Sequence, residues 1–137
     1  MRTALDTNVL SAILDNEPKA EELGEKLGEA KAAGSIVVCG VVFAEAMAHP
    51  KATESSVRRF LDDTGVEIAF EFEEAVWVVA GTRYARYAAR RRRSSDISSR
   101  RLLADFIIGA HALVQADRLM TLDRGRYERD FPELKLV

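Results

Sequence analysis

The 137-residue sequence predicts an α/β fold, in which a parallel sheet carries helices on both faces. Short, β-branched apolar runs alternate along the chain with longer segments of helical periodicity, and this alternation is typical of parallel sheets. The composition, 47% hydrophobic and 31% charged, is that of a globular chain. The length predicts a single domain over residues 1–137.

Capping and breaking residues divide the first half of the chain. Asp6 interrupts the first apolar run, and Thr7 can cap the helix that follows. Pro18 suits a first helical turn, whereas Gly34 and Pro50 suit helix ends. We expect, in order, a strand over 1–5, a helix over 7–14, a helix from 18 to 34, a strand over 35–39, helices over 41–49 and 54–63, and a strand or connector over 66–70.

The second half predicts two long helices and two short strands. Helical periodicity extends over 72–93, and four serines in six residues mark a polar break over 94–99. In the apolar helix expected next, we expect Gly109 to allow close packing against the sheet. The remaining expectations are the extent of that helix (102–116), a strand over 118–121, a turn over 123–125 and a last strand over 134–137.

Several classes of protein are excluded by composition. The uncharged apolar stretches, such as residues 76–82, are all far short of the ~20 residues that a membrane span needs. The N-terminal apolar run contains Asp6 and no small-residue cleavage site, so it does not resemble a signal peptide. The single cysteine, Cys39, excludes an internal disulfide and a cysteine-based zinc site. We therefore expect a cytoplasmic protein without a membrane partner.

Four acidic residues from distant segments are the candidate site. Asp6 and Asp123 each follow a predicted strand, and ligands of parallel sheets bind beyond the carboxyl ends of strands. Glu45 and Asp105 interrupt the apolar segments VVFAEAMA and LLADFIIGAHAL. A carboxylate buried on such a face without a partner costs several kcal/mol, and a shared metal ion is one way to offset that cost.

The four acids allow two interpretations. Carboxylates without His or Cys suit Mg²⁺ or Mn²⁺, which can activate a water and stabilise a leaving oxygen in phosphodiester hydrolysis. Equally, Asp6 and Asp123 could be ordinary cap or turn residues, Glu45 could pair with a basic group, and Asp105 suits a helix N-terminus through the helix dipole alone.

A resemblance to a known family favours the metal interpretation. The segments LDTNVLSAIL, FAEAMAHP, LLADFIIGAHAL and LMTLDRGRY, in this order, resemble the PIN domain and, more narrowly, the VapC-type ribonuclease toxins of toxin–antitoxin pairs. The resemblance covers nearly the whole chain. It implies an α/β/α sandwich with a parallel sheet of about five strands. It also implies an acidic cluster that binds Mg²⁺ or Mn²⁺ and hydrolyses RNA.

The resemblance assigns roles by position. It implies that Asp6 and Asp105 are the principal metal ligands, that Glu45 ligates directly or through water and positions the nucleophile, and that Asp123 holds a second ion or an outer water. Many family members have Asn where this chain has Leu122, so the chain departs from the family pattern next to Asp123. The polar residues expected to orient these ligands are Thr7, Asn8 and Thr121.

The resemblance also implies partners. VapC-type toxins form homodimers and are held inactive by a small antitoxin whose C-terminal segment crosses a groove near the site. Five apolar residues could line such a groove or could equally be core: Leu10, Ile13, Leu14, Leu23 and Leu27.

Basic residues are concentrated in the second half of the chain. Residues 83–137 hold 13 basic and 7 acidic groups, against 7 and 15 in residues 1–82. The candidates for RNA contact along the helix expected over 72–93 are Arg83, Arg86, Arg90 and Arg93, which follow helical spacing. The alternative is a solvated helix end. Arg124 and Arg126 adjoin Asp123, where they could meet a scissile phosphate or could neutralise surplus carboxylates.

The acidic residues together with this resemblance imply a metal-dependent endoribonuclease, the toxin of a VapBC-type pair, that acts on RNA such as tRNA or another structured RNA. A phosphatase of the haloacid-dehalogenase type would need a second Asp where this chain has Asn8, and a receiver domain would need a late Lys, for which only Lys135 is present. Two alternatives share the fold: an inactive PIN-like module that binds RNA or protein, and a housekeeping RNA-processing nuclease.

Overall fold

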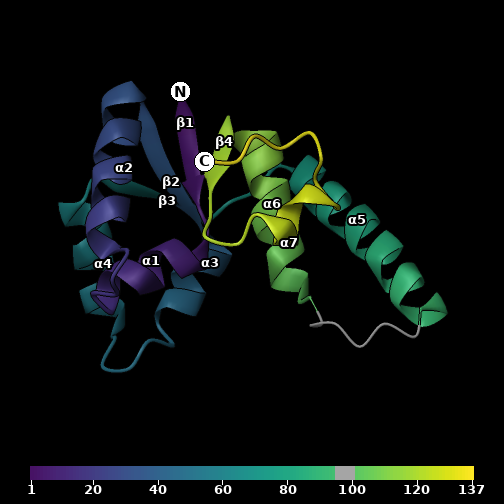
Figure 1. Ribbon diagram of the computed structural model, residues 1–137, viewed down its shortest axis with the longest axis horizontal. Helices are drawn as coiled ribbons and strands as arrows, with labels where there is room; N and C mark the ends of the chain where they lie inside the picture. Colours follow the sequence, from purple (N-terminus) through teal and green to yellow (C-terminus); the bar gives the residue numbers. More distant parts are fainter. Residues whose placement is uncertain (95–100) are drawn as a thin grey trace.

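A parallel sheet runs through the centre of the protein (Figure 1). The computed structural model describes residues 1–94 and 101–137, and within them the sheet has four strands in the order β3-β2-β1-β4. The strands are β1 (Arg2–Leu5), β2 (Ser35–Cys39), β3 (Val66–Ala69) and β4 (Arg118–Met120). All three pairings are parallel. Their carboxyl ends therefore meet at one edge of the sheet.

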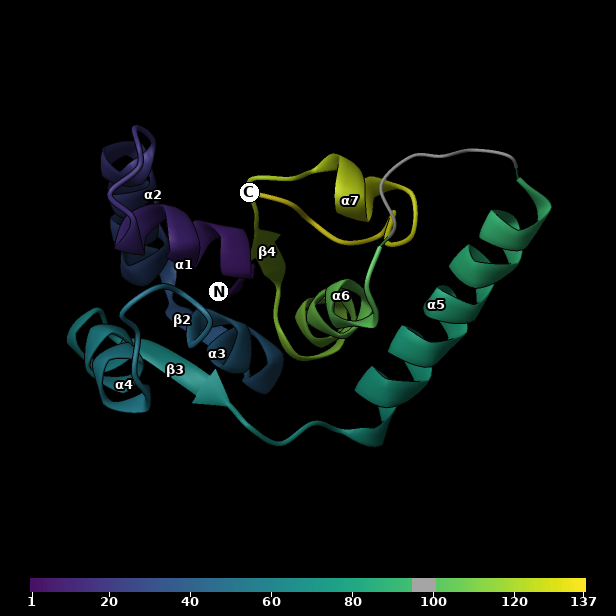
Figure 2. The same ribbon diagram turned by 90° about the horizontal axis from the view of Figure 1, so that it is seen from below.

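Helices connect these strands. Between β1 and β2 lie α1 (Thr7–Leu14) and α2 (Ala20–Ala33), and between β2 and β3 lie α3 (Gly40–Ala46) and α4 (Glu54–Asp63). The long helices α5 (Glu74–Arg93) and α6 (Leu103–Gln115) precede β4, and the short helix α7 (Gly125–Glu128) follows it. Figure 2 shows α1 and α2 on one side of the sheet and α6 on the other, with α5 outside α6.

The apolar runs become the core because they lie between these helix layers. In the central strands, Leu5, Ile36 and Val37 are each at most 1% exposed. A strand covered on both faces buries consecutive residues, and β2 accordingly has four buried residues in succession. This confirms the α/β/α architecture expected from the sequence. None of the described helices is both long and apolar enough to cross a membrane.

Most predicted elements are present with similar bounds. The strand over 35–39 and the helix over 54–63 have the predicted ends. The segment over 66–70, predicted as a strand or a connector, is the edge strand β3. The N-cap of α1 is Asp6 rather than Thr7, because the Asp6 side chain accepts a hydrogen bond from the Thr7 amide. The predicted polar break over 94–99 lies, except for Ser94, outside the described residues.

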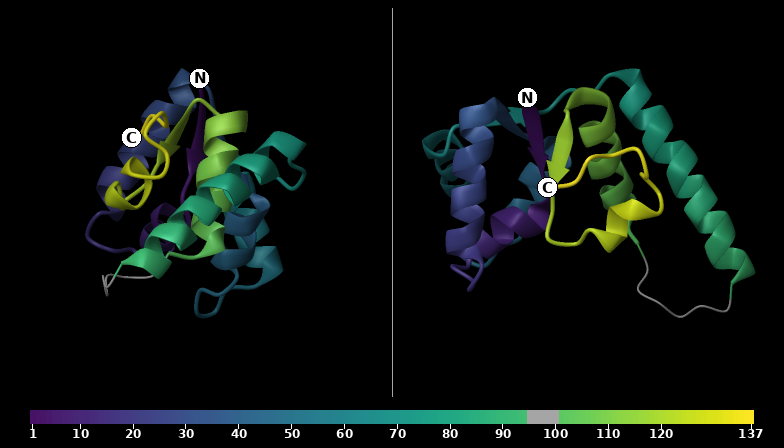
Figure 3. Two further views of the ribbon diagram at one scale, coloured as in Figure 1. Left: turned by 90° about the vertical axis from the view of Figure 1, so that its right-hand side faces the viewer. Right: turned by 45° about the horizontal axis from the view of Figure 1, so that its top comes forward.

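The sheet has one strand fewer than the expectation of about five among the described residues. The predicted last strand, 134–137, makes a single parallel bridge between Leu136 and Leu119 instead of a continuous ladder. In Figure 3 this C-terminal segment returns to β4. Because β4 has only three residues, it offers little backbone for a fifth strand to pair with. The predicted turn over 123–125 likewise continues into the short helix α7.

Gly109 permits a close approach, but to a different partner from the predicted one. A Cβ added at Gly109 would lie 2.6 Å from the ring of Phe131, which belongs to the C-terminal segment rather than to the sheet. Phe131 is itself buried, at 2% exposure. The glycine therefore allows the segment after α7 to pack against α6, and α6 carries Asp105.

Candidate active site

Asp6 is the most deeply buried of the four acids, at 1% exposure. It follows β1 directly and caps α1. Its Oδ1 accepts from the Thr7 amide at 2.8 Å, and its Oδ2 accepts from the hydroxyls of Thr121 at 2.9 Å and Tyr127 at 2.8 Å. Burial raises the pKa of Asp6, whereas the hydrogen bonds from Tyr127, Thr121 and Thr7 lower it. The carboxylate is thus removed from water but held by three donors.

Thr121 organises the turn that follows β4. Its Oγ1 donates to Asp6 and accepts from the Asp123 amide at 3.0 Å and from Asn8 Nδ2 at 3.4 Å. Asn8 also accepts from the Leu122 amide through Oδ1, at 3.1 Å. These bonds join the start of α1 to the turn that carries Asp123. Asn8 and Thr121 therefore link the two strand-end acids, and their role in orienting metal ligands stays a prediction.

Glu45 reaches the same region through Thr7. The Thr7 hydroxyl donates to Glu45 Oε1 at 2.6 Å, which joins α1 to α3. Glu45 is exposed, although its helix sequence is otherwise apolar. Glu45 was selected from the sequence because burial of an unpaired carboxylate is costly, and this argument therefore does not apply to it. It applies to Asp6, which is fully buried, and in part to Asp105, whose side chain is 15% exposed.

Arg126 connects the remaining two acids. Its Nη1 donates to Asp105 Oδ1 at 3.2 Å, and its Nε lies 3.4 Å from Asp123 Oδ2. Partial burial alone would lower the pKa of Arg126, but the negative charges of Asp105, Asp123 and Asp6 raise it above its usual value. Asp105 also accepts from the Leu102 amide at 3.1 Å, so it caps α6 as well. Asp105 and Asp123 thus share one guanidinium group.

The residues fit a hard divalent cation in kind, but the side chains do not converge in their present arrangement. Four carboxylates provide the oxygen ligands that Mg²⁺ and Mn²⁺ prefer. Yet the described residues contain no group of three or more His, Cys, Asp or Glu side chains close enough to hold a metal ion. The reason is visible in the contacts, because Arg126 lies between Asp105 and Asp123 and Thr7 holds Glu45. A shared ion would require side chains to move.

Tyr127 is part of this site but was not predicted from the sequence. It is 1% exposed, and its hydroxyl donates to Asp6, 121 residues away in the sequence. Burial and the charge of Asp6 raise the pKa of this phenol well above its usual range, so it stays a proton donor. No sequence signal joins these two residues. The return of the chain after β4 brings them together.

The arginines predicted to contact RNA divide into two groups. Arg83 forms a two-pronged ion pair with Glu133, at 2.5 Å, and Arg90 pairs with the buried carboxylate of Asp130 at 2.6 Å. Arg86, Arg93 and Arg124 are exposed. Arg124 lies 3.7 Å from Glu128 on α7. Arg83 and Arg90 thus bind the C-terminal segment to α5, and contact of any of these arginines with RNA stays a prediction.

The apolar residues predicted as groove or core lie on α1 and α2. Leu10 and Leu23 belong to the buried core. The other three, Ile13, Leu14 and Leu27, are half-buried. The three half-buried residues are thus the members of this set that reach the surface, and the groove stays a prediction.

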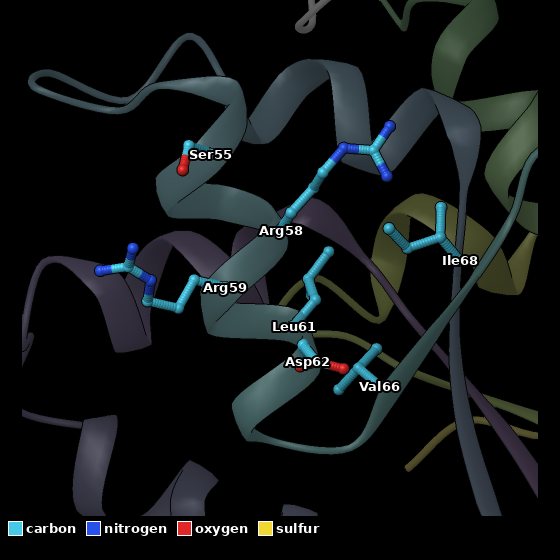
Figure 4. Close-up of a pocket in the computed structure, with 7 residues that line it drawn as sticks. All are labelled: Ser55, Arg58, Arg59, Leu61, Asp62, Val66 and Ile68. Carbon is cyan, nitrogen blue, oxygen red and sulfur yellow. The ribbon is translucent and has the colours of Figure 1, made fainter.

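A pocket near the sheet edge lies apart from the acids. It is formed by α4 and β3, and its lining residues are Ser55, Arg58, Arg59, Leu61, Asp62, Val66 and Ile68 (Figure 4). The side chains of Arg58 and Arg59 leave α4 in different directions in this view. The pocket therefore includes none of the four acids and does not gather its two cations around one ligand.

Comparisons with known proteins agree with this geometry. A search among curated proteins finds no similar sequence. Among solved structures, the VapBC2 complex of Rickettsia felis bound to a promoter DNA fragment contains a chain with a TM-score of 0.70 and 20% identity, covering 100% of this chain and 98% of its own. VapBC-1 from nontypeable Haemophilus influenzae gives a TM-score of 0.67 and 19% identity, with coverage of 100% and 97%. The PIN domain model matches residues 3–132, and the chain therefore belongs to the PIN-domain family.

Proposed function

We propose that this protein is a Mg²⁺- or Mn²⁺-dependent endoribonuclease and the toxin of a VapBC-type toxin–antitoxin pair. One observation carries the proposal: four carboxylates from four distant segments of a PIN-family chain are linked through Thr7, Thr121 and Arg126 at the carboxyl edge of a parallel sheet. The similar solved structures are VapBC complexes, which favours a toxin over a housekeeping nuclease.

The four acids would hold the ion in two different roles. Asp6 and Asp105 would be the principal ligands, with Glu45 and Asp123 as additional ligands, directly or through water. When bound, such an ion supplies Lewis acidity to the phosphate and lowers the pKa of water. Asp6 is suited to this role because Tyr127 and Thr121 hold one of its oxygens in place. Neutral donors orient the carboxylate without replacing its charge.

Glu45 would act on the attacking water. Thr7 fixes Glu45 through Oε1, so that Oε2 is the atom that would take the proton of the water. Because Glu45 is exposed, solvent and RNA reach it without passing through the core. The single domain would thus bind RNA over the carboxyl edge of the sheet and hydrolyse one phosphodiester bond there.

The proposal includes partners and a compartment. The partner would be a small antitoxin, as in the VapBC complexes. The protein would form a homodimer in the cytoplasm, and its substrate would be structured RNA such as tRNA. A short antitoxin-like reading frame beside the gene would favour the toxin over a housekeeping nuclease. Purification of the protein alone and together with that product, followed by measurement of mass in solution, tests the dimer and the partner.

Cleavage of total tRNA by the purified chain without antitoxin tests the activity. We expect discrete cuts in Mg²⁺ or Mn²⁺ that disappear in EDTA and fall at least about a hundredfold in Asp6→Asn. Asp63→Asn is the matched control, because Asp63 is an exposed acid on α4 outside the site. Cutting by Asp6→Asn at the wild-type rate would contradict the site. Binding of RNA without cuts in either metal would favour the inactive module.

A further inference from the structure

Arg126 lies inside the acidic site and not on its rim. Its guanidinium contacts Asp105 Oδ1 at 3.2 Å and Asp123 Oδ2 at 3.4 Å, and its amide donates to Asp123 Oδ1 at 3.3 Å. The side chain is 37% exposed, against 15% for Asp105. Two of the four proposed ligands therefore share one cation that belongs to the chain itself.

We propose that Arg126 is a resident counter-ion that competes with the divalent metal for Asp105 and Asp123. This inference rests on the metal site of the proposed function. The guanidinium on Asp105 Oδ1 and Asp123 Oδ2 opposes a metal ion shared by the same carboxylates, because the two positive charges repel each other at this distance. Binding of one ion by both carboxylates therefore favours the departure of Arg126 from them.

The other two acids differ in this respect. Asp6 accepts from the neutral hydroxyls of Thr121 and Tyr127, and Glu45 accepts from the neutral hydroxyl of Thr7. A neutral donor can remain on one lone pair of a carboxylate while a metal uses another. Metal binding thus leaves the Asp6 and Glu45 contacts in place and displaces the cation on Asp105 and Asp123. Arg126 sets the ion concentration at which the site fills.

Isothermal titration calorimetry of Mn²⁺ binding to the full chain tests this competition. Arg126→Gln removes the cation, and Arg124→Gln is the matched control, because Arg124 is exposed, pairs with Glu128 and changes the net charge equally. In the wild type, Mn²⁺ binding must break two partly exposed ion pairs of Arg126. Their loss should weaken the affinity of the wild type for Mn²⁺ by roughly fivefold to tenfold. We expect Arg126→Gln to bind Mn²⁺ tighter than Arg124→Gln by that factor.

Arg126→Lys provides a second variant that keeps the charge. We expect its affinity for Mn²⁺ to stay within about twofold of wild type, because an ammonium group can still pair with the carboxylates. Thermal unfolding in EDTA shows whether each variant is folded before the titration. Mn²⁺ binding by Arg126→Gln that is equal to or weaker than that of Arg124→Gln overturns the inference. So does equal tightening in Arg126→Lys.

The tRNA cleavage assay separates this inference from the proposed function. If the wild type cuts RNA in Mn²⁺ and Arg126→Gln binds the ion no more tightly than Arg124→Gln, the proposed competition by Arg126 is wrong. The proposed nuclease function is then unaffected. If no variant binds Mn²⁺ and the wild type does not cut RNA, both proposals fail together.

Discussion

Tyr127 shows how one hydroxyl can join the last part of the chain to the first strand. It donates to Asp6 Oδ2 at 2.8 Å, and both residues are 1% exposed. A buried carboxylate keeps its charge only if donors replace the water it has lost. Tyr127 is therefore as much a part of the Asp6 environment as Thr121, although it is no candidate ligand.

Tyr127→Phe removes that donor without changing the ring. We expect the free energy of unfolding to fall by about 1.5–3 kcal/mol, because Asp6 stays buried with one hydrogen bond fewer. Urea denaturation at neutral pH measures the change. Tyr84→Phe is the control, since the described residues give the Tyr84 hydroxyl no hydrogen-bond partner, and its effect should stay within about 0.5 kcal/mol. Equal losses in both variants would mean that the Asp6 bond stabilises nothing.

The acids themselves were accessible from sequence to different degrees. Asp6 and Asp123 follow from their places after strands, because the carboxyl ends of parallel strands share one edge. Glu45 was selected by an argument from burial that its exposure contradicts, although it does lie at the same edge through Thr7. Tyr127 could not be found, because its contact depends on how the chain returns after β4.

Helix α6 depends on a glycine at one point of contact. Most of its apolar face is buried, and Gly109 lets the ring of Phe131 approach closely. We expect Gly109→Ala to lower the free energy of unfolding by about 1–3 kcal/mol, because the added methyl group would overlap a buried ring.

Gly28→Ala in α2 is the matched control for that substitution. A Cβ at Gly28 meets nothing within 4 Å, so alanine should raise the free energy of unfolding by about 0.5–1 kcal/mol through helix propensity. The two variants should thus change stability in opposite directions in thermal unfolding. A stabilising Gly109→Ala would show that Phe131 can move aside without cost.

Elements with strong local signals were predicted well, and elements made by tertiary contacts were not. The strand over 35–39 is continuously β-branched and apolar, and the helix over 54–63 has an N-cap at Thr53 and a positive-φ glycine, Gly65, after it. By contrast, α7 has only four residues, too few for periodicity to be read. The predicted last strand over 134–137 is reduced to a single bridge, because its partner β4 has only three residues.

At the scale of the whole molecule, the chain after β4 ties the outer helices to the site. Asp130 is buried and accepts from Arg90 at 2.6 Å and from Arg101 at 2.8 Å. Arg101 also donates to the carbonyl oxygens of Gly125 and Arg126. Arg90, which the sequence offers for RNA contact, and Arg101 thus join α5 and the residues before α6 to Asp130 and to α7, the helix that carries Arg126.

His111 makes the stability of the whole fold depend on pH. It is 1% exposed within α6, and its Nε2 has no hydrogen-bond partner among the described residues. Burial, with a smaller contribution from the charge of Arg2, lowers the pKa of His111 to about 4 from 6.5. Between these two values the unfolded chain binds a proton that the folded chain does not. Stability is therefore retained above pH 6.5 and is lost as the pH falls toward 4.

His111→Leu removes this titration. Between pH 7 and pH 4.5, the wild type should lose about 2 kcal/mol more free energy of unfolding than the variant does. Urea denaturation at intervals across that range measures both slopes, and the carboxylates common to the two proteins cancel in the difference. At pH 7 the variant should be at least as stable as the wild type, because leucine leaves no buried polar atom without a partner. Parallel slopes would mean that His111 is protonated in the folded protein at the same pH as in the unfolded chain.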